Sequence, residues 1–310
     1  MSFLSISDQP RRLGQSQLYV SPIAYGLWRF AGTSVSEAQS KIETALEVGI
    51  TLFDEADIYG VDGGGSFGDS ERLFGEVLKA APHLREKMVI ASKGGIILGY
   101  PYDSSPAYLR SAVEASLSRM GIDCIDLYQI HRPDFLGHPE QMAAVLTELR
   151  DAGKIKAVGV SNYTASQFRA LQAHLPFPIA THQPEFSCWQ HQALRDGVLD
   201  QCLECRVTPL AWSPIAGGRL AMRYEQAAAL EGGDRLVALL KVLDRIATEQ
   251  SVARTAVALA WTMVHPSGVI PIIGTQNLER IQNSVDALKV QLTRPQWNEI
   301  LVAAQGEPLP

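Results

Sequence analysis

The octapeptide FDEADIYG, residues 53–60, places three carboxylates and one tyrosine directly after an apolar run. Carboxylate pairs usually indicate hydrolysis, but the phenol five positions after Asp54 is a group that can donate a proton. A free phenol has a pKa of about 10, so Tyr59 needs a neighbouring cation that stabilises its anion near pH 7. The segment therefore predicts that another part of the chain brings a positive charge to Tyr59.

A lysine and a histidine end two later apolar runs, at Lys93 in VIASK and at His131 in DLYQIH. Lys93 beside the phenol would stabilise the phenolate and lower the pKa of Tyr59, while Asp54 would hold the ammonium in an ion pair. Such a phenol can protonate a carbonyl oxygen, and His131 can donate a second hydrogen bond that orients the substrate. These residues therefore predict carbonyl reduction, in which a hydride reaches carbon and a proton reaches oxygen.

Eight short, apolar, β-branched runs alternate with helix-length amphipathic stretches along the chain. The predicted strands are residues 22–26, 50–54, 88–93, 126–131, 155–161, 179–183, 207–213 and 269–274. Eight even repeats favour a closed parallel barrel over an open sheet. We therefore predict one α/β domain over residues 1–310. It would be a (β/α)8 TIM barrel with an N-terminal β-hairpin (11–21) and an extra C-terminal helix (293–304).

In a TIM barrel the active site lies at the carboxyl ends of the strands. Polar or aromatic residues end the second to eighth predicted strands: Asp54 with Tyr59, Lys93, His131, Ser161 with Asn162, Gln183, Trp212 with Ser213, and Gly274 with Thr275. Each of these signals is weak alone, because a lysine after a strand is usually a solvated surface residue. Their joint placement on one rim favours an active site, and residues 219–234 are expected to form a long loop that could cover it.

Composition and charge point to a small-molecule partner. The 310 residues carry a net charge of −6, with no basic stripe for nucleic acid or an anionic membrane. The first residues lack the apolar segment of a signal peptide, and no run reaches the roughly 18 apolar residues of a membrane span. We therefore expect a cytoplasmic protein with reduced thiols, in which Cys202 and Cys205 lack the second pair that a structural zinc site needs.

Two further patterns are weaker than they look. Gly63, Gly65 and Gly68 satisfy G-x-G-x-x-G, but a Rossmann fingerprint opens directly off its strand, whereas Gly63 lies nine positions beyond Asp54. A mobile loop beside the pocket is the favoured interpretation. Histidines 182 and 191 lack a third ligand at a recognisable spacing, so no metal is expected.

Seven motifs occur in order along nearly the whole chain: FDEADIYG, VIASKGG, DLYQIHRPD, GVSNY, HQPEFS, AWSPIAGG and IPIIGTQNLERI. In these motifs the sequence resembles the aldo-keto reductase superfamily. The resemblance implies a catalytic tetrad of Asp54, Tyr59, Lys93 and His131, with NADPH/NADP+ as cofactor and an aldehyde or ketone as substrate. It also implies that Ser161, Asn162 and Gln183 contact the nicotinamide carboxamide, and that Trp212 stacks on the nicotinamide ring.

The cofactor phosphates are expected at AWSPIAGG and at the helix that begins near Asn277. The residues implied there are Ser213, Pro214, Ile215, Gly217, Gly274, Thr275 and Gln276. Arg280 is expected to bind the 2′-phosphate, beside the hydroxyl of Thr275. The preference for NADPH over NADH should be moderate, because Gln276 and Asn277 are neutral where many relatives carry a cation.

The chain departs from the family pattern at several positions. Glu55 stands where a small hydroxyl residue is frequent, and Trp212 replaces the commoner tyrosine. Asn283 and Ser284 occupy the place of a Glu-Asn pair that usually reads the adenine, so the adenine contacts are expected to be weaker or rearranged. Trp28, beside the first strand, is expected to line the substrate pocket.

Two other functions are alternatives to carbonyl reduction. A nucleotide-sensing regulatory subunit is one alternative, since potassium-channel β subunits resemble the same family, and no sequence feature excludes it. A barrel glycosidase with Asp54 and Asp57 as paired acids is the other. The spacing argues against it, because two carboxylates three residues apart on one stretch do not face each other across a glycosidic bond at about 5–9.5 Å.

Overall fold

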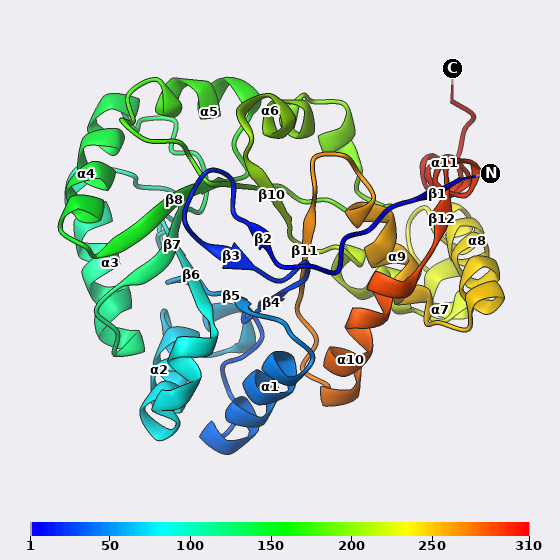
Figure 1. Cartoon of the computed structure of the whole chain (residues 1–310), viewed down its shortest axis with the longest axis horizontal. Coiled ribbons are helices and arrows are strands. Elements are labelled where there is room, and N and C mark those ends of the chain that lie inside the picture. The colour runs from blue at the N-terminus through cyan, green and yellow to red at the C-terminus, as the bar shows by residue number, and fades with distance from the viewer. Residues whose placement is uncertain (1, 310) are drawn as a thin grey trace.

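The computed structural model describes residues 2–309, and in that part of the chain eight parallel strands close into one barrel (Figure 1). The strands are β4 (Ala24–Gly26), β5 (Leu52–Asp54), β6 (Val89–Gly94), β7 (Ile125–Ile130), β8 (Ile155–Ser161), β9 (Thr181–Gln183), β10 (Thr208–Ala211) and β11 (Ile270–Ile273). They pair in chain order, and β11 closes the ring by pairing with β4. Each strand overlaps one of the predicted runs, which confirms the (β/α)8 TIM barrel.

Amphipathic helices surround the barrel (Figure 1). They are α1 (Val35–Glu47), α2 (Asp69–Ala80), α3 (Pro106–Met120), α4 (Pro139–Asp151), α5 (Ala165–Gln172), α6 (Val198–Cys205), α7 (Tyr224–Ala228), α8 (Gly233–Gln250), α9 (Arg254–Met263), α10 (Leu278–Asn283) and α11 (Arg294–Gln305). Reciprocal side-chain capping starts several of them; Ser34 and Glu37, for example, form a capping box at α1. Within residues 2–309, no helix has both the length and the apolar character that a membrane crossing requires.

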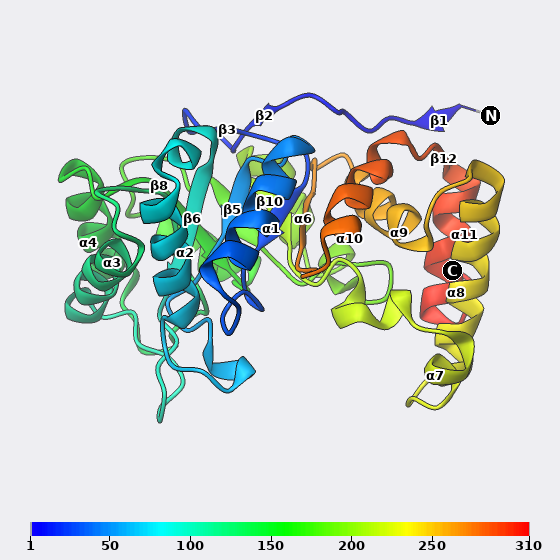
Figure 2. The same ribbon diagram turned by 90° about the horizontal axis from the view of Figure 1, so that it is seen from below.

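A hairpin lies across the amino end of the barrel (Figure 2). Its strands, β2 (Arg11–Arg12) and β3 (Tyr19–Val20), pair antiparallel, and its apolar residues pack against side chains from the strand bodies. The loops that follow β5 and β6 extend from the opposite, carboxyl end. The hairpin therefore confirms the predicted N-terminal element and leaves the carboxyl rim open for a site.

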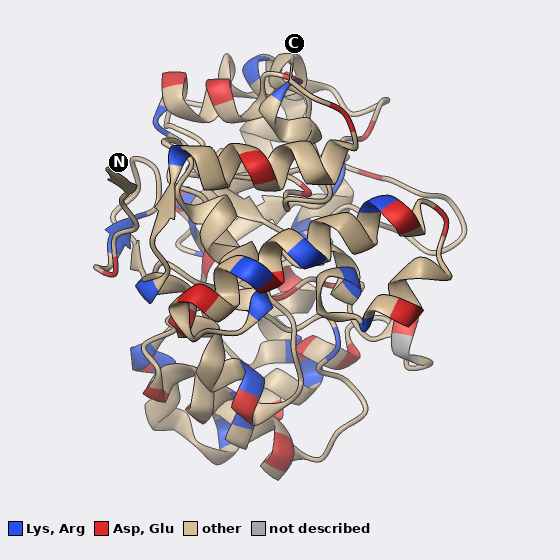
Figure 3. Cartoon of the chain, turned by 90° about the vertical axis from the view of Figure 1, so that its right-hand side faces the viewer, with Lys and Arg blue, Asp and Glu red and all other residues tan. Residues whose placement is uncertain are grey.

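The C-terminal helix α11 packs against α8 on the outside of the barrel (Figure 2). Trp297 of α11 stacks on Trp261 of α9 with ring centroids 4.8 Å apart, and Arg245 of α8 pairs with Glu299 of α11 at 2.6 Å. On the side of the molecule in Figure 3, basic and acidic residues are interspersed along the outer helices. This extra helix confirms the predicted C-terminal element, and it is held mainly by its apolar face because exposed ion pairs stabilise little.

The prediction of a long loop over residues 219–234 was wrong. The 3₁₀ segment η4 (Ala216–Ala221) and α7 occupy half of this stretch, and α8 already begins at Gly233. Arg254 holds the segment in place by donating to the carbonyl of Met222 at 2.8 Å, while Ala227 is fully buried. Short helical turns fixed by such contacts do not form a free flap.

Close approach of α2 and α3 depends on a glycine inside α2. A Cβ added to Gly75 would lie 2.3 Å from the carbonyl oxygen of Arg119 and 3.0 Å from Cα of Met120. Glycine in a helix interior costs about 1 kcal/mol relative to alanine. Glycine is therefore needed at position 75 because α3 lies too close for a side chain, although glycine lowers the helix propensity of α2.

We predict that Gly75→Ala lowers the free energy of unfolding by about 1–3 kcal/mol, because the backbone of α3 cannot move away without disturbing the core. Thermal unfolding followed by circular dichroism measures the effect. The exposed neighbour on the same helix gives the control, Glu76→Ala, which should change stability little. A stabilised Gly75→Ala protein would show that helix propensity dominates at this contact.

Candidate active site

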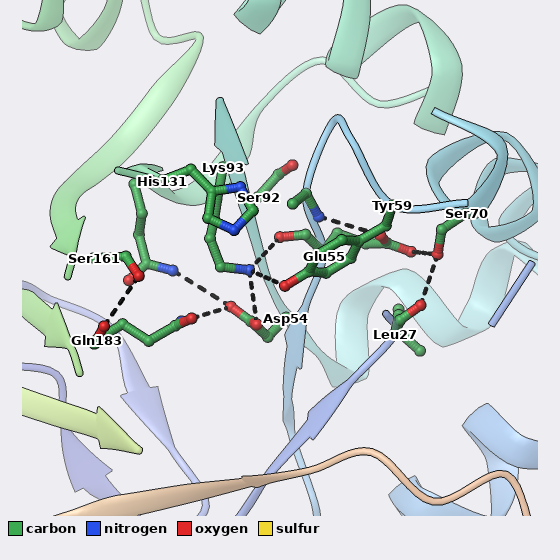
Figure 4. A network of polar contacts seen from close by, with 12 residues as sticks. Leu27, Asp54, Glu55, Tyr59, Ser70, Ser92, Lys93, His131, Ser161 and Gln183 are labelled. Carbon is green, nitrogen blue, oxygen red and sulfur yellow. Dashed lines mark hydrogen bonds and ion pairs between the residues drawn. The ribbon is translucent and has the colours of Figure 1, made fainter. Parts of the chain in front are cut away.

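Four side chains from three neighbouring strands meet at the carboxyl rim of the barrel (Figure 4). Asp54 ends β5, Lys93 lies in β6, and His131 directly follows β7. Tyr59 lies in the turn after β5 that leads into the 3₁₀ segment η1 (Val61–Gly63). Because β5, β6 and β7 are parallel neighbours, their carboxyl ends bring these residues together.

Lys93 is fully buried and uses all three of its ammonium hydrogens. Its Nζ lies 2.8 Å from Asp54 Oδ2, 2.8 Å from the carbonyl oxygen of Glu55 and 3.0 Å from the hydroxyl oxygen of Tyr59. Burial alone would lower the pKa of Lys93, but Asp54 and Tyr59 outweigh burial and raise that pKa, so the amine stays charged. Since Lys93 donates to the phenol oxygen, the hydroxyl hydrogen of Tyr59 points elsewhere.

The predicted lowering of the pKa of Tyr59 was wrong. Burial raises the pKa of Tyr59 to about 12, although Lys93 acts in the opposite direction. Burial destabilises the phenolate of Tyr59 by more free energy than the ammonium of Lys93 stabilises it, because that ammonium also interacts with Asp54. Tyr59 is therefore a protonated donor throughout the neutral range, and Lys93 directs its hydrogen.

His131 lies edge-on to Tyr59, with ring centroids 5.8 Å apart and an interplanar angle of 81°. Burial, together with the charges of Lys93 and Arg132, lowers the pKa of His131 well below its ordinary value. Its Nδ1 is buried and has no hydrogen-bond partner among residues 2–309. The ring is therefore a neutral imidazole with one N–H to donate.

Asp54 is anchored through both carboxylate oxygens. Oδ2 accepts from Lys93, and Oδ1 accepts from Gln183 Nε2 at 3.0 Å and from Gln129 Nε2 at 3.3 Å. Gln183 is a predicted site residue, but Gln129 was missed by sequence reasoning. The available signal was a polar amide between the apolar residues of LYQI, residues 127–130.

A second group of predicted residues surrounds Asn162, after β8. Its Nδ2 donates to Ser161 Oγ at 2.7 Å and to the carbonyl oxygen of His131 at 3.3 Å, while its Oδ1 accepts from Trp212 Nε1 at 2.9 Å. Ser161 Oγ in turn donates to the carbonyl oxygen of Gln183 at 3.0 Å. The structure thus joins Ser161, Asn162, Gln183 and Trp212 in one network beside His131.

The segment after β10 has an unusual backbone. Ser213, Ala216, Gly217 and Gly218 all have positive φ. A Cβ added to Gly217, Gly218 or Gly274 would meet nothing within 4 Å in the described structure. We call residues 213–218 together with Gly274 the shelf, and these three glycines leave its surface open.

The remaining predicted residues lie around this shelf and the rim. Thr275 and Gln276 follow β11, and Arg280 is exposed on α10. Asn283 is exposed, whereas Ser284 is buried and donates to the carbonyl oxygen of Ile281 at 2.6 Å.

The amide atoms of Gln276 point inward and have no hydrogen-bond partner among residues 2–309. Trp28 is 42% exposed and donates from Nε1 to Asp62 Oδ2 at 2.8 Å. Trp28 therefore presents its side chain to solvent, whereas the amide of Gln276 is buried.

Behind Tyr59 lies a buried cluster of three further carboxyl groups, which we call the acid cluster: Glu55, Asp57 and Glu71. Glu71 pairs with Arg119 at 2.7 Å, Glu55 Oε1 lies 2.7 Å from Ser70 Oγ, and Asp57 Oδ2 accepts from Tyr108 at 3.1 Å. Burial and the charge of Glu71 raise the pKa of Asp57 to about 8 and that of Glu55 well above its ordinary value. Asp57 is 1% exposed, so it cannot reach a glycosidic bond opposite Asp54.

Two other sequence patterns have structural explanations. His182 is fully buried, its Nε2 lies 3.0 Å from the carbonyl oxygen of Tyr163, and its ring stacks on Phe168. Burial lowers the pKa of His182 to about 4, so the ring is neutral. Gly68 caps α2 well beyond the end of β5, so the G-x-G-x-x-G pattern lies in a loop before α2.

Comparison with known proteins agrees with this geometry. A profile of the Aldo/keto reductase family matches residues 22–303. The chain is 48% identical over 312 residues to the 6-dehydroglucose reductase of Novosphingobium aromaticivorans, and the match covers 100% of both chains. It is 40% identical over 303 residues to the 6-dehydroglucose reductase of Agrobacterium fabrum, covering 94% of this chain and 96% of that relative.

Solved structures show the same architecture. The glycerol dehydrogenase of Gluconobacter oxydans is similar with a TM-score of 0.83 and 26% identity, over 98% of each chain. A thermostable aldo-keto reductase in complex with the inhibitor epalrestat has the same fold, with a TM-score of 0.79 over 95% of this chain and 99% of that one at 23% identity. Because the family profile spans nearly the whole chain and its relatives match along their full length, this protein is an oxidoreductase of the aldo/keto reductase family.

Proposed function

We propose that this protein uses NADPH to reduce an aldehyde or ketone to an alcohol, with Tyr59 as the general acid. The observation that carries this proposal is the 3.0 Å hydrogen bond from Lys93 Nζ to the hydroxyl oxygen of Tyr59. It leaves the phenol hydrogen free to reach a carbonyl oxygen. A nicotinamide cofactor, when bound, supplies the hydride that reduces the carbonyl carbon.

The chain itself handles the proton and the developing charge. Tyr59 gives its proton to the carbonyl oxygen as negative charge builds there, and Lys93 stabilises the phenolate that remains. Asp54 fixes Lys93 through the 2.8 Å ion pair. The neutral ring of His131 donates a second hydrogen bond to the same oxygen.

The residues at the rim fit a nicotinamide dinucleotide. Ser161, Asn162 and Gln183 would hold the carboxamide, and Trp212 would stack on the nicotinamide ring. The open shelf at Ser213, Pro214, Ile215 and Gly217, with Gly274, would take the pyrophosphate, since added Cβ atoms at Gly217 and Gly274 meet nothing within 4 Å in residues 2–309.

The 2′-phosphate would lie against Arg280 and Thr275. Asn283 and Gln276 have weaker support, because the amide of Gln276 points inward and Asn283 faces solvent.

The substrate we propose to test first is a sugar aldehyde. Two relatives, at 48% and 40% identity, are named 6-dehydroglucose reductase. The half-exposed ring of Trp28 and the carboxylate of Asp62 that it binds would line the substrate pocket and suit a hydroxylated ring. The single-domain organisation and the cytoplasmic location stay predictions from the sequence.

Tyr59→Phe should lower kcat for carbonyl reduction by about 10²–10⁴-fold, because the ring remains but the proton donor is lost. The dissociation constant of NADPH, measured by fluorescence quenching, should stay nearly unchanged. Tyr19→Phe is the control, since it removes an exposed tyrosine hydroxyl on the hairpin at the amino end of the barrel. Near-normal activity in Tyr59→Phe would exclude the proposed role of the phenol. Negligible wild-type turnover with every carbonyl tried would instead favour the regulatory-subunit alternative.

The pH dependence of reduction should show no alkaline limb below about pH 10. Reduction needs a protonated phenol, and burial raises the pKa of Tyr59 to about 12, so the proton is retained as pH rises through 8 and 9. Steady-state kcat measured between pH 6 and 10 tests this. A fall in kcat centred near pH 8 would show that Lys93 lowers the pKa of Tyr59 in the working enzyme, as the sequence alone suggested.

Arg280→Ala should raise the dissociation constant of NADPH by roughly 10- to 100-fold, the scale of a hydrogen bond to a charged group. The affinity for NADH should change little, because NADH has no 2′-phosphate. The control is Arg294→Ala, which removes an exposed arginine on α11. Equal losses of NADH and NADPH affinity would show that Arg280 does not bind the 2′-phosphate.

A further inference from the structure

We propose that Gln129 is a positioning residue for carbonyl reduction, which clamps Asp54 and thereby keeps Lys93 aligned with Tyr59. The inference rests on the proposed function, because it assigns a task within the same proton-donating site. Gln129 is the fifth of the six residues of β7 and is fully buried. Its amide is hydrogen-bonded to Asp54, so the role assigned to it acts through that carboxylate and not through contact with the substrate.

Both ends of the Gln129 amide have partners inside the barrel. Its Nε2 donates to Asp54 Oδ1 at 3.3 Å, and its Oε1 accepts from Thr181 Oγ1 at 3.0 Å. The hydroxyl of Thr181 thus fixes which end of the amide faces the carboxylate. A buried amide oriented in this way can only donate to Asp54.

The fold makes room for this pair at Gly159. In the parallel register Gln129 lies opposite Gly159 on β8, and Gly159 lies opposite Thr181 on β9. A Cβ at Gly159 would lie 2.1 Å from Thr181 Oγ1 and 2.9 Å from Gln129 Cγ. Lys93 lies opposite Gln129 on the other side, so the clamp and the lysine share one layer of the barrel.

Asp54 needs a donor that is independent of the cofactor site. Gln183 also donates to Asp54 Oδ1, at 3.0 Å, but its proposed contact with the nicotinamide carboxamide gives its amide a second task. Gln129 has no such task. With Oδ1 held by a neutral amide, Oδ2 stays directed at Lys93 Nζ, 2.8 Å away, and no charge is added beside the ion pair.

The first test is Gln129→Leu, which removes the hydrogen bonds to Asp54 and Thr181 but keeps a side chain of similar volume. We expect kcat to fall by about 10- to 100-fold, with the dissociation constant of NADPH and the KM of the carbonyl within about twofold of wild type. Thr181→Val keeps the Gln129 amide beside Asp54 but removes the hydroxyl that orients it. This variant should therefore lower kcat by less than Gln129→Leu does.

Gln129→Glu tests the clamp through the pH dependence of kcat, which a purely structural role of Gln129 would not change. When its new carboxyl group is protonated it can still donate to Asp54, and when ionised it repels Asp54. The ratio of variant to wild-type kcat should therefore fall steadily as pH rises. A ratio that does not depend on pH would overturn the clamp.

The matched control is Gln201→Leu, which removes another buried glutamine amide, bonded to the carbonyl of Ala165 on the outer helices. Thermal unfolding and NADPH fluorescence quenching are measured on all variants. If wild type is active and Gln129→Leu has the same kcat as Gln201→Leu, the inference is overturned and the proposed function stays intact. A wild-type protein that reduces no carbonyl would instead overturn the proposed function itself.

Discussion

The ion pair between Lys93 and Asp54 is the constraint on which the site depends. Both residues lie in the barrel interior, at 0% and 2% exposure, where an unpaired charge would cost several kcal/mol. The pair is tolerated because each polar atom has a partner: three acceptors for the ammonium, and amide donors on the carboxylate oxygen that faces away from it. Tyr59 is one of those acceptors, so the hydrogen bond that completes the partners of the Lys93 ammonium also orients the phenol.

The acid cluster behind Tyr59 contains more carboxyl groups than the nearby cations can pair with. Lys93 and Arg119 are the cations that contact this region, and they pair with Asp54 and Glu71. Burial, together with the charge of Glu71, raises the pKa values of Glu55 and Asp57. The carboxyl groups behind the phenol therefore hold their protons more readily than free ones, which reduces the negative charge that would oppose a phenolate.

Eight even strand–helix repeats were enough to predict the barrel. The polar residues at the strand ends then predicted the meeting of Asp54, Tyr59, Lys93 and His131, because parallel strands share one carboxyl edge. The pKa of Tyr59 could not be predicted, since it depends on how deeply the surrounding turns bury the phenol. Gln129 was missed because β7 is buried on both faces, so alternation gives no sign of which side chains point inward. Residues 219–234 were mistaken for a loop because their helical turns are too short to show periodicity.

Burying neutral acids and neutral histidines in one barrel has a consequence for folding. Asp57, with its pKa raised to about 8, contributes stability that is complete below the unfolded value of about 4 and is lost as pH rises through 8. His182, with its pKa lowered to about 4, acts in the opposite sense, and its contribution is lost as pH falls below about 6.5. Between about pH 4 and 6.5 one group gains what the other loses. Proton uptake by His182 on unfolding offsets proton release by Asp57, so the contributions of these two groups nearly cancel across mildly acidic conditions.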